Sequence, residues 1–165
     1  MVVQAAQTGH LVLSTLHTND AAGAVSRMLD LGVEPFVLAS SLRAVMAQRL
    51  VRRVCPDCST TVEADPDELA ALGLDPEIPF TYHKGAGCPR CLHTGYYGRV
   101  GLFELLVVEE SVRNLITQRA DAVTIRGAAV AAGMLTLRTD GIQKVRAGLS
   151  TIDEILRVTE SDVLV

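Results

Sequence analysis

The sequence contains no tryptophan, and aromatic residues make up only 4% of its 165 residues. A core must therefore be built from aliphatic side chains, and the aromatic stacking platform of a single-strand nucleic-acid binder is not expected. No apolar run approaches the roughly 18 residues that cross a bilayer, so no transmembrane segment is predicted. The first ten residues lack the basic region and apolar run of a secretory signal, and we therefore expect a cytoplasmic location.

The chain also has little excess charge. Fifteen Lys and Arg residues against nineteen Asp and Glu residues leave a net charge of −4 at pH 7, which argues against a protein that coats nucleic acid directly. Hydrophobic residues make up 48% of the chain and charged residues 21%. This composition supports a packed core and excludes general disorder.

The N-terminal region shows the pattern of a strand followed by a helix. Residues 10–16 form a short apolar run, typical of a strand covered on both faces in a parallel sheet. Thr18, Asn19 and Asp20 then offer oxygen atoms that can cap a helix over residues 21–31. Gly32 is the expected end of this helix.

A second helix is predicted to start at Pro35, whose fixed φ suits a first helical position. Apolar residues recur at helical spacing from Val37 to Leu50, which favours one continuous helix. This helix would end in a basic stretch, formed by Arg43, Arg49, Arg52 and Arg53.

Between Cys55 and Cys91 the composition changes to Pro, Gly, Asp and Thr, which indicates a loop-rich insertion with one helix over residues 66–72. Apolar patterns return with a strand over residues 100–108. Helices are then predicted near residues 109–119, 124–132 and 136–147. Thr151 and Glu154 have the spacing of a capping box and should begin the last helix.

Four cysteines form two Cys-x-x-Cys knuckles, made by Cys55 with Cys58 and by Cys88 with Cys91. Two residues between cysteines let a tight turn direct both sulfurs at one point, and two such turns supply the four thiolates of a structural zinc site. The 29 intervening residues exceed the common spacing of zinc ribbons. Two alternatives to zinc are disulfides and a redox pair.

Histidines near these knuckles and near the first apolar run are further candidate site residues. His83 and His93 lie beside the second knuckle, where either residue could replace a cysteine ligand. His10 and His17 bracket the predicted strand over residues 10–16. Ligands of open α/β sheets bind outside the carboxyl ends of strands, so His17 lies where a phosphate could be sensed.

Several segments together resemble the C-terminal half of the secretion and pilus motor ATPases, the family of the type II secretion and type IV pilus assembly ATPases. The segment over residues 8–20 resembles the histidine box of this family. The likeness continues in Glu34-Pro-Phe, in residues 47–53, in the two knuckles, and in residues 95–104 and 150–159. The segment Gly101-Leu-Phe-Glu-Leu-Leu-Val-Val108 is closer to the type II secretion branch.

This resemblance implies a homo-hexameric cytoplasmic motor, peripheral to the inner membrane, that acts with inner-membrane platform proteins. By position, His17 and His10 match the two histidines of the box, and the resemblance implies that His17 senses the terminal phosphate. ATP and magnesium would be cofactors of the complete motor only, and zinc would be structural.

The chain lacks the motif Gly-x-x-x-x-Gly-Lys-Ser/Thr, whose backbone and lysine hold the β- and γ-phosphates. The acidic boxes of the family, which hold magnesium and position the attacking water, are also absent. We therefore expect that the chain is part of a longer motor and that it does not hydrolyse ATP alone. Whether the chain by itself is an enzyme stays open.

The predicted fold class is α/β with a zinc insertion. Residues 1–53 would be the end of a RecA-like nucleotide domain with the histidine box, residues 54–98 a tetracysteine zinc lobe, and residues 99–165 a mainly helical C-terminal lobe. The alternative is a stand-alone zinc-ribbon module without enzymatic activity. The stretch of Arg43, Arg49, Arg52 and Arg53 would then bind an acidic partner, with Arg49 and Arg53 four residues apart on one side of a helix.

Overall fold

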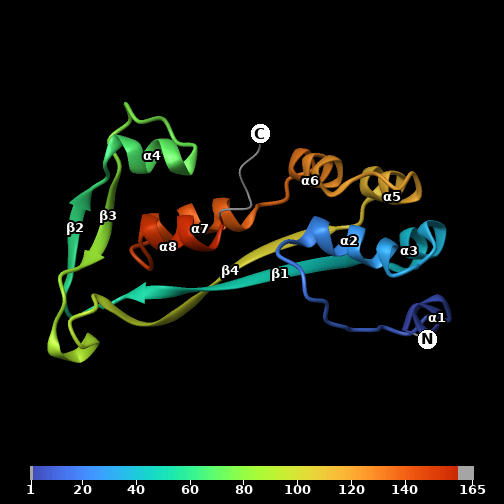
Figure 1. The fold of residues 1–165 in the computed structure, drawn as a ribbon, viewed down its shortest axis with the longest axis horizontal. Coiled ribbons are helices and arrows are strands. Elements are labelled where there is room, and N and C mark those ends of the chain that lie inside the picture. Colours follow the sequence, from blue (N-terminus) through green and yellow to red (C-terminus); the bar gives the residue numbers. More distant parts are fainter. Residues whose placement is uncertain (1, 160–165) are drawn as a thin grey trace. The chain divides into compact units, whose positions relative to one another are not determined.

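A computed structural model describes residues 2–159, and its fold is α/β (Figure 1). The elements follow the chain in the order α1 (Val2–Gln7), α2 (Ala21–Asp30), α3 (Pro35–Ser41), β1 (Ala44–Val54), β2 (Ser59–Glu63), α4 (Pro66–Leu72), β3 (Thr81–Gly85), the 3₁₀ helix η1 (Pro89–Cys91), β4 (Tyr96–Val107), α5 (Glu110–Thr117), α6 (Ala122–Ala131), α7 (Leu137–Arg146) and α8 (Ile152–Val158).

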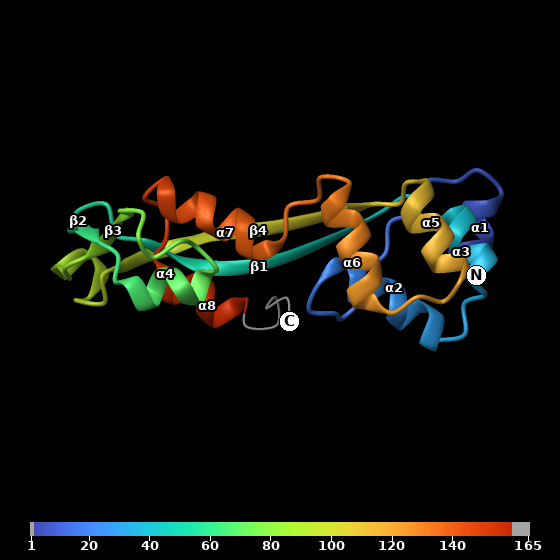
Figure 2. The same ribbon diagram turned by 90° about the horizontal axis from the view of Figure 1, so that it is seen from above.

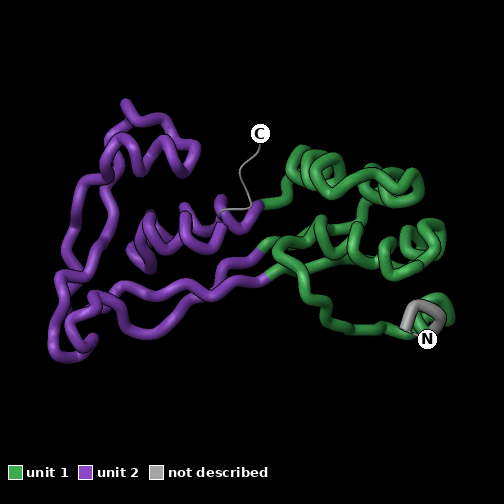
Figure 3. Tube along the Cα trace, in the orientation of Figure 1, with its two compact units in different colours: residues 1–47, 104–135 green, residues 48–103, 136–165 purple. Residues whose placement is uncertain are grey.

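The chain divides into two compact units (Figure 3). Unit 1 contains residues 1–47 and 104–135, and unit 2 contains residues 48–103 and 136–165. Each unit is therefore assembled from two separate stretches of the sequence. The predicted segments 1–53, 54–98 and 99–165 assign a functional role to each stretch of the chain, and that division stays a prediction.

The core of unit 1 lies between α2, α3, α5 and α6. It consists of aliphatic side chains, as the shortage of aromatic residues requires. Fully buried members from different elements include Val25, Leu38, Leu106, Ile116 and Ile125. Burying side chains of this size stabilises a fold by about 1.5–3 kcal/mol each, so this cluster is the main source of stability of the unit.

Among the residues predicted to cap the first long helix, Asp20 and Gly32 are confirmed. Asp20 is the N-cap of α2, and its Oδ1 accepts a hydrogen bond of 2.6 Å from the Gly23 N–H. Gly32 has a φ of +86°, and its N–H donates to the Leu29 carbonyl at 3.0 Å. A left-handed residue at this point ends a helix, as expected for glycine.

The predicted strand over residues 10–16 is wrong, because these residues have no regular secondary structure. Leu11 and Leu13 are 87% and 89% exposed. A strand is stable only when a neighbouring strand accepts its backbone hydrogen bonds. Within residues 2–159, the two sheets contain β1 with β4 and β2 with β3, and neither sheet includes this segment.

The predicted helix from Pro35 to Leu50 is half wrong. α3 ends at Ser41, and residues from Ala44 onward form strand β1. Exposure alternates along β1, with Met46 and Leu50 exposed while Val51 is buried. Exposure that alternates with a period of two is typical of a strand with one covered face. The apolar residues of this segment fit helical spacing as well, so the sequence pattern alone did not distinguish the two structures.

β1 pairs with β4, which begins about forty residues after β1 ends. The Val108 N–H donates to the Arg43 carbonyl at 2.9 Å, and the Cys55 N–H donates to the Gly95 carbonyl at 2.9 Å. The start of one strand therefore lies beside the end of the other, and the strands run in opposite directions. The predicted strand over residues 100–108 is confirmed by β4.

In unit 2, β2 and β3 form an antiparallel pair in which Thr61 lies opposite His83. The excursion between them contains α4, as predicted. Asp65 and Glu68 form its capping box, and Gly73 ends it in the left-handed conformation. Figure 2 shows α4 beside α8, and the two helices are in contact.

The predicted C-terminal helices are confirmed as α5 to α8, with boundaries shifted by a few residues. Thr151 is the N-cap of α8, and its Oγ1 accepts from the Glu154 N–H. The Glu154 carboxylate is directed elsewhere, so the capping box is only half formed. Within residues 2–159, none of the helices has the length and apolar character needed to span a bilayer.

Candidate metal centre and histidine segment

The four cysteines lie together in unit 2. Cys55 follows the last residue of β1, and Cys58 precedes β2. Cys88 and Cys91 come from the second knuckle, which is a single turn of 3₁₀ helix. All four cysteines are free of disulfides, and their sulfur atoms lie within 4.8 Å of one another.

The distances between the sulfurs fit a zinc ion. Cys55 and Cys88 are 3.8 Å apart at Sγ, as are Cys58 and Cys91, and Cys88 and Cys91 are 3.7 Å apart. A zinc–sulfur bond of about 2.3 Å places the sulfurs of a tetrahedral site about 3.8 Å apart. The donor set and its spacing therefore match a closed structural zinc site, with each knuckle contributing two sulfurs.

Backbone donors surround these sulfurs. The Gly87 N–H donates to Cys58 Sγ at 3.3 Å, and the N–H groups of Cys88 and Gly95 donate to Cys91 Sγ at 3.2 and 3.3 Å. Burial opposes ionisation of Cys91, but these N–H donors lower the pKa of its thiol to about 6. Burial raises the pKa of the Cys58 thiol to about 12. The Cys58 thiol therefore becomes a thiolate near neutral pH only beside a compensating cation.

The second knuckle holds an uncommon backbone conformation. Leu92 and His93 follow Cys91 with φ values of +51° and +59°, which non-glycine residues rarely adopt. Gly95 packs so closely on Gly85 that a Cβ atom on Gly85 would lie 2.1 Å from the Gly95 carbonyl oxygen. This close approach of two backbones fixes the knuckle against strand β3.

The two histidines near the second knuckle are not part of the cysteine cluster. Among residues 2–159, the group that could hold a metal consists of the four cysteines alone. His83 Nδ1 lies 2.9 Å from Ser59 Oγ across the β2–β3 pair. His93 is exposed. This arrangement gives neither histidine the position of a ligand.

Three residues of the basic stretch predicted on a helix, Arg49, Arg52 and Arg53, lie on strand β1, so Arg49 and Arg53 do not form a helical patch. Arg52 is held by the buried Glu154 through its backbone N–H at 2.8 Å and its Nη2 at 2.7 Å. Its guanidinium also lies 4.1 Å from the centre of the Tyr96 ring. Arg52 is thus a structural cation of unit 2.

His10 and His17 lie in unit 1, at either end of the irregular segment over residues 10–18. Both side chains are exposed. His10 Nδ1 lies 3.0 Å from Thr8 Oγ1. The structure therefore places both histidines on an accessible segment that leads directly into α2.

A group of charged residues that sequence reasoning missed fixes the start of α2. The carboxylate of Glu104 is 1% exposed and accepts from the Ala21 N–H at 2.8 Å. Arg126 Nη2 donates to Asp20 Oδ2 at 2.8 Å. The sequence contained one indication, because Glu104 is the single charged residue in the apolar run over residues 100–108. Leu102 and Leu106, two residues to either side of Glu104 on β4, are also buried.

The fold and the cysteine cluster define a class of protein. The chain belongs to the family of type II/IV secretion system proteins, whose model matches residues 1–157. Within this family it is 47% identical over 162 residues to the type II secretion system protein E of Pseudomonas aeruginosa, and 44% identical over 160 residues to the type II secretion system ATPase E of Vibrio cholerae. These matches cover 98% and 97% of the chain.

The chain is also 47% identical over 161 residues to the type IV pilus assembly ATPase PilB of Thermus thermophilus, of which it covers 18%. It spans about a third of the length of the two secretion relatives, 32% of each. The solved structure of the pilus retraction motor PilT with bound ADP has a similar fold. It matches 95% of the chain and 34% of PilT, with a TM-score of 0.61 and 22% identity.

Proposed function

We propose that this chain is the C-terminal part of a motor ATPase that couples ATP hydrolysis to protein secretion or pilus assembly. The observation that carries the proposal is the 47% identity to a type II secretion system protein E over 98% of the chain. The fold shared with the PilT motor supports the same assignment. Residues 1–53 would then be the end of a RecA-like nucleotide domain, followed by the zinc lobe and the helical lobe.

The four cysteines would hold a structural zinc ion. Three of the separations between their sulfurs are 3.7–3.8 Å, and all lie within 4.8 Å, which supports this role. Four thiolates fill the tetrahedral shell of zinc and leave no position for a substrate, so the metal would stabilise the lobe and take no part in hydrolysis. The ion would link the end of β1 to the knuckle that precedes β4.

His17, assisted by His10, would sense the terminal phosphate of ATP. The exposure of His17 supports the proposal, because the imidazole is free to meet a nucleotide held by other parts of the motor. ATP and magnesium would be bound mainly by sequence outside this chain, which lacks the phosphate-binding loop. Glu104 and the Asp20–Arg126 pair would keep the segment in position by fixing the start of α2.

The partners proposed for the complete motor are five further copies, in a homo-hexamer, and inner-membrane platform proteins. The location would be cytoplasmic and peripheral to the inner membrane. The alternative is a stand-alone zinc module that would bind an acidic partner through Arg49 and Arg53, which lie on strand β1 and not on a helix. Arg52 of the same strand is occupied by Glu154.

The test compares His17→Ala with the wild type in the complete motor, with His93→Ala as a control for loss of an exposed histidine. Losing one donor to the transferring phosphate should lower kcat by at least about tenfold, while the KM for ATP changes little. Wild-type turnover in His17→Ala would refute the sensing role. ATP hydrolysis by the isolated 165-residue chain would refute the proposal that it needs the rest of the motor.

A further inference from the structure

The negative charge of the chain is concentrated in the zinc lobe. Residues 54–83 contain seven Asp and Glu residues and no Lys or Arg. The chain as a whole has a net charge of −4, so all other residues together carry +3. A local excess of this kind creates a negative potential that attracts cationic groups.

Among residues 2–159, six of these seven carboxylates have no Lys or Arg partner. Asp57 pairs with Arg90 at 2.7 Å. The remaining six are Glu63, Asp65, Asp67, Glu68, Asp75 and Glu77. Within residues 2–159, no Lys or Arg lies within ion-pairing distance of them, and the ion pairs of unit 2 involve other carboxylates.

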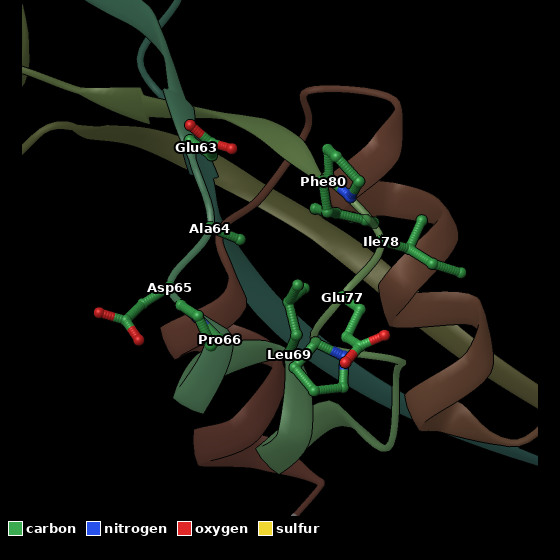
Figure 4. Close-up of a pocket in the computed structure, with 10 residues that line it drawn as sticks. Glu63, Ala64, Asp65, Pro66, Leu69, Glu77, Ile78 and Phe80 are labelled. Carbon is green, nitrogen blue, oxygen red and sulfur yellow. The ribbon is translucent and has the colours of Figure 1, made fainter.

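Three of the unpaired carboxylates line a pocket of about 420 Å³ beside α4 (Figure 4). Its walls are residues 63–66, which connect β2 to α4, and residues 76–80, which precede β3. A hydrogen bond of 2.8 Å from the Ala64 N–H to the Phe80 carbonyl joins the two walls. Figure 4 shows Leu69 of α4 between the two walls.

The pocket combines this charge with apolar surface. Pro66, Leu69 and Phe80 line it together with Ile78, whose side chain is 60% exposed. Two more prolines, at positions 76 and 79, stiffen the second wall. A preformed apolar surface binds a partner at a lower cost in conformational entropy than a flexible one.

Two cations lie near this region, and neither pairs with a pocket carboxylate. The Arg146 guanidinium lies 5.6 Å from the centre of the Phe80 ring. Arg138 Nη1 donates to the Ala71 carbonyl in α4. The contact of Arg146 shows that the ring of Phe80 already attracts a guanidinium group, as aromatic faces do.

We propose that this acidic apolar pocket, formed by residues 63–66, Leu69 and 76–80, binds a cationic apolar peptide segment of a partner protein. A Lys or Arg side chain would pair with a carboxylate at the rim of the pocket, Glu63 or Glu77, and a neighbouring aliphatic side chain would cover Ile78 and Leu69. The volume is near the lower end of the roughly 300–1,000 Å³ of small-ligand sites, which suits one or two side chains.

Charge and geometry favour this occupant over others. Nucleic acid would be repelled by the six carboxylates. A divalent cation would need several oxygen ligands at one point, and the group of side chains that could hold a metal within residues 2–159 is the cysteine cluster. The proposal concerns a surface remote in sequence from His17, so it stands whether or not the motor function is correct.

The test uses the zinc-loaded 165-residue chain, labelled with ¹⁵N, and a synthetic decapeptide of alternating Lys and Leu. A decapeptide of alternating Glu and Leu is the charge control. Amide shifts should be concentrated at residues 63–80 with the Lys peptide and absent with the Glu peptide. Fluorescence anisotropy of the same two peptides, each carrying a fluorescent label, gives the Kd. The Kd of the Lys peptide should rise steeply with salt concentration.

Two variants separate the charge contribution from the apolar contribution. Glu63→Gln/Glu77→Gln removes two charges without changing shape and should weaken binding about tenfold. Ile78→Ser alters an exposed side chain, leaves the fold intact and should weaken binding about threefold. Glu109→Gln/Glu110→Gln, which neutralises two exposed carboxylates of unit 1, should bind like the wild type.

Three outcomes would overturn the proposal. Equal weakening in the Glu109/Glu110 variant would show attraction to overall charge only. Shifts spread over all acidic residues, with none at Ile78 or Phe80, would exclude the pocket. Saturable binding of Mg²⁺ or Ca²⁺ at residues 63–77, with loss of peptide binding when the ion is present, would identify a cation site instead.

Discussion

Glu154 on α8 accepts hydrogen bonds from both the backbone and the guanidinium of Arg52 on β1, 102 residues earlier in the chain. The Glu154 side chain is 1% exposed, and Arg157 donates two further hydrogen bonds to it at 3.0 and 2.9 Å. This carboxylate therefore joins the last helix to the strand that leads into the first knuckle. Removing any one of these donors would leave part of the buried negative charge uncompensated and would destabilise the fold.

Glu154→Gln should destabilise unit 2 by about 2–3 kcal/mol, because a neutral amide replaces the charge that both arginines need. The figure allows for the exposure of both guanidinium groups, each about half exposed. Urea unfolding of the zinc-loaded chain measures the difference. Asp153→Asn is the control, since Asp153 is 57% exposed and its pair with Lys84 spans 3.7 Å. It should change stability by less than about 0.5 kcal/mol.

The effect of Glu154→Gln should depend on pH. Burial opposes ionisation of Glu154, but the hydrogen bonds from Arg157 and Arg52 lower its pKa to about 2, below the ordinary 4.5. Because this pKa is lower in the folded state, the ionised carboxylate stabilises the fold fully when the pH is above 4.5. The stabilisation is lost as the pH falls from 4.5 toward 2. The difference between wild type and variant should be constant from pH 5 to 8 and shrink below about 4.5. A difference that grows on acidification would contradict this assignment.

Zinc removal should unfold the zinc lobe. Structural zinc contributes about 10 kcal/mol or more to the folding of small units, and the β2–β3 pair with α4 has a small core of its own. Cys88→Ser should lose the ion and the dispersed amide signals of residues 55–95. One zinc per chain in the wild type, and none in the variant, is the result expected from elemental analysis. Retention of one zinc in Cys88→Ser would point to a substitute ligand such as His83 or His93.

Gly85→Ala should be among the most damaging single substitutions in unit 2. The new Cβ would lie 2.1 Å from the Gly95 carbonyl oxygen, which is rigid backbone, and relief of such a clash costs about 2–4 kcal/mol. Gly127→Ala in α6 is the matched control, because no atom lies within 4 Å of its added Cβ. That substitution should stabilise the chain by about 0.5–1 kcal/mol, since alanine favours a helix interior. Thermal unfolding distinguishes the two directions.

Asp20→Ala should cost more than the loss of an ordinary helix cap. Asp20 caps α2 and also binds Arg126, and both side chains of this pair are only 12% exposed. Asp121 caps α6 with a 2.7 Å bond to the Thr124 N–H in an exposed position. Asp121→Ala should therefore lose about 1 kcal/mol and Asp20→Ala about 2–3 kcal/mol. Equal losses in chemical unfolding would show that Arg126 adds nothing to the cap.

Features that depend on neighbouring residues were predictable from the sequence. Asp20 and Gly32 act on backbone groups within four residues, so their chemistry alone fixes where α2 begins and ends. The cysteines were predictable for a related reason, since two residues between a pair of sulfurs permit only a tight turn.

The two errors concern strands. β1 exists because β4, about forty residues beyond its end, supplies its hydrogen bonds, and no local pattern encodes that partner. Residues 10–16 show the converse, an apolar run that no strand of the described chain accompanies. Glu104 was missed for the same reason, because its partner Ala21 lies 83 residues away. The β-propensity of a segment does not specify its partner strand, and a strand forms only where such a partner is available.

The two knuckles have a consequence for how the lobe tolerates change. A metal ion bound by both knuckles closes the 29-residue excursion between Cys58 and Cys88 into a loop whose ends are fixed. The entropy lost in closing a loop grows only with the logarithm of its length, so doubling the excursion costs about 0.6 kcal/mol. With a metal ion bound by both knuckles, the excursion between them would accept insertions of very different size while β1 and β4 on either side keep their pairing.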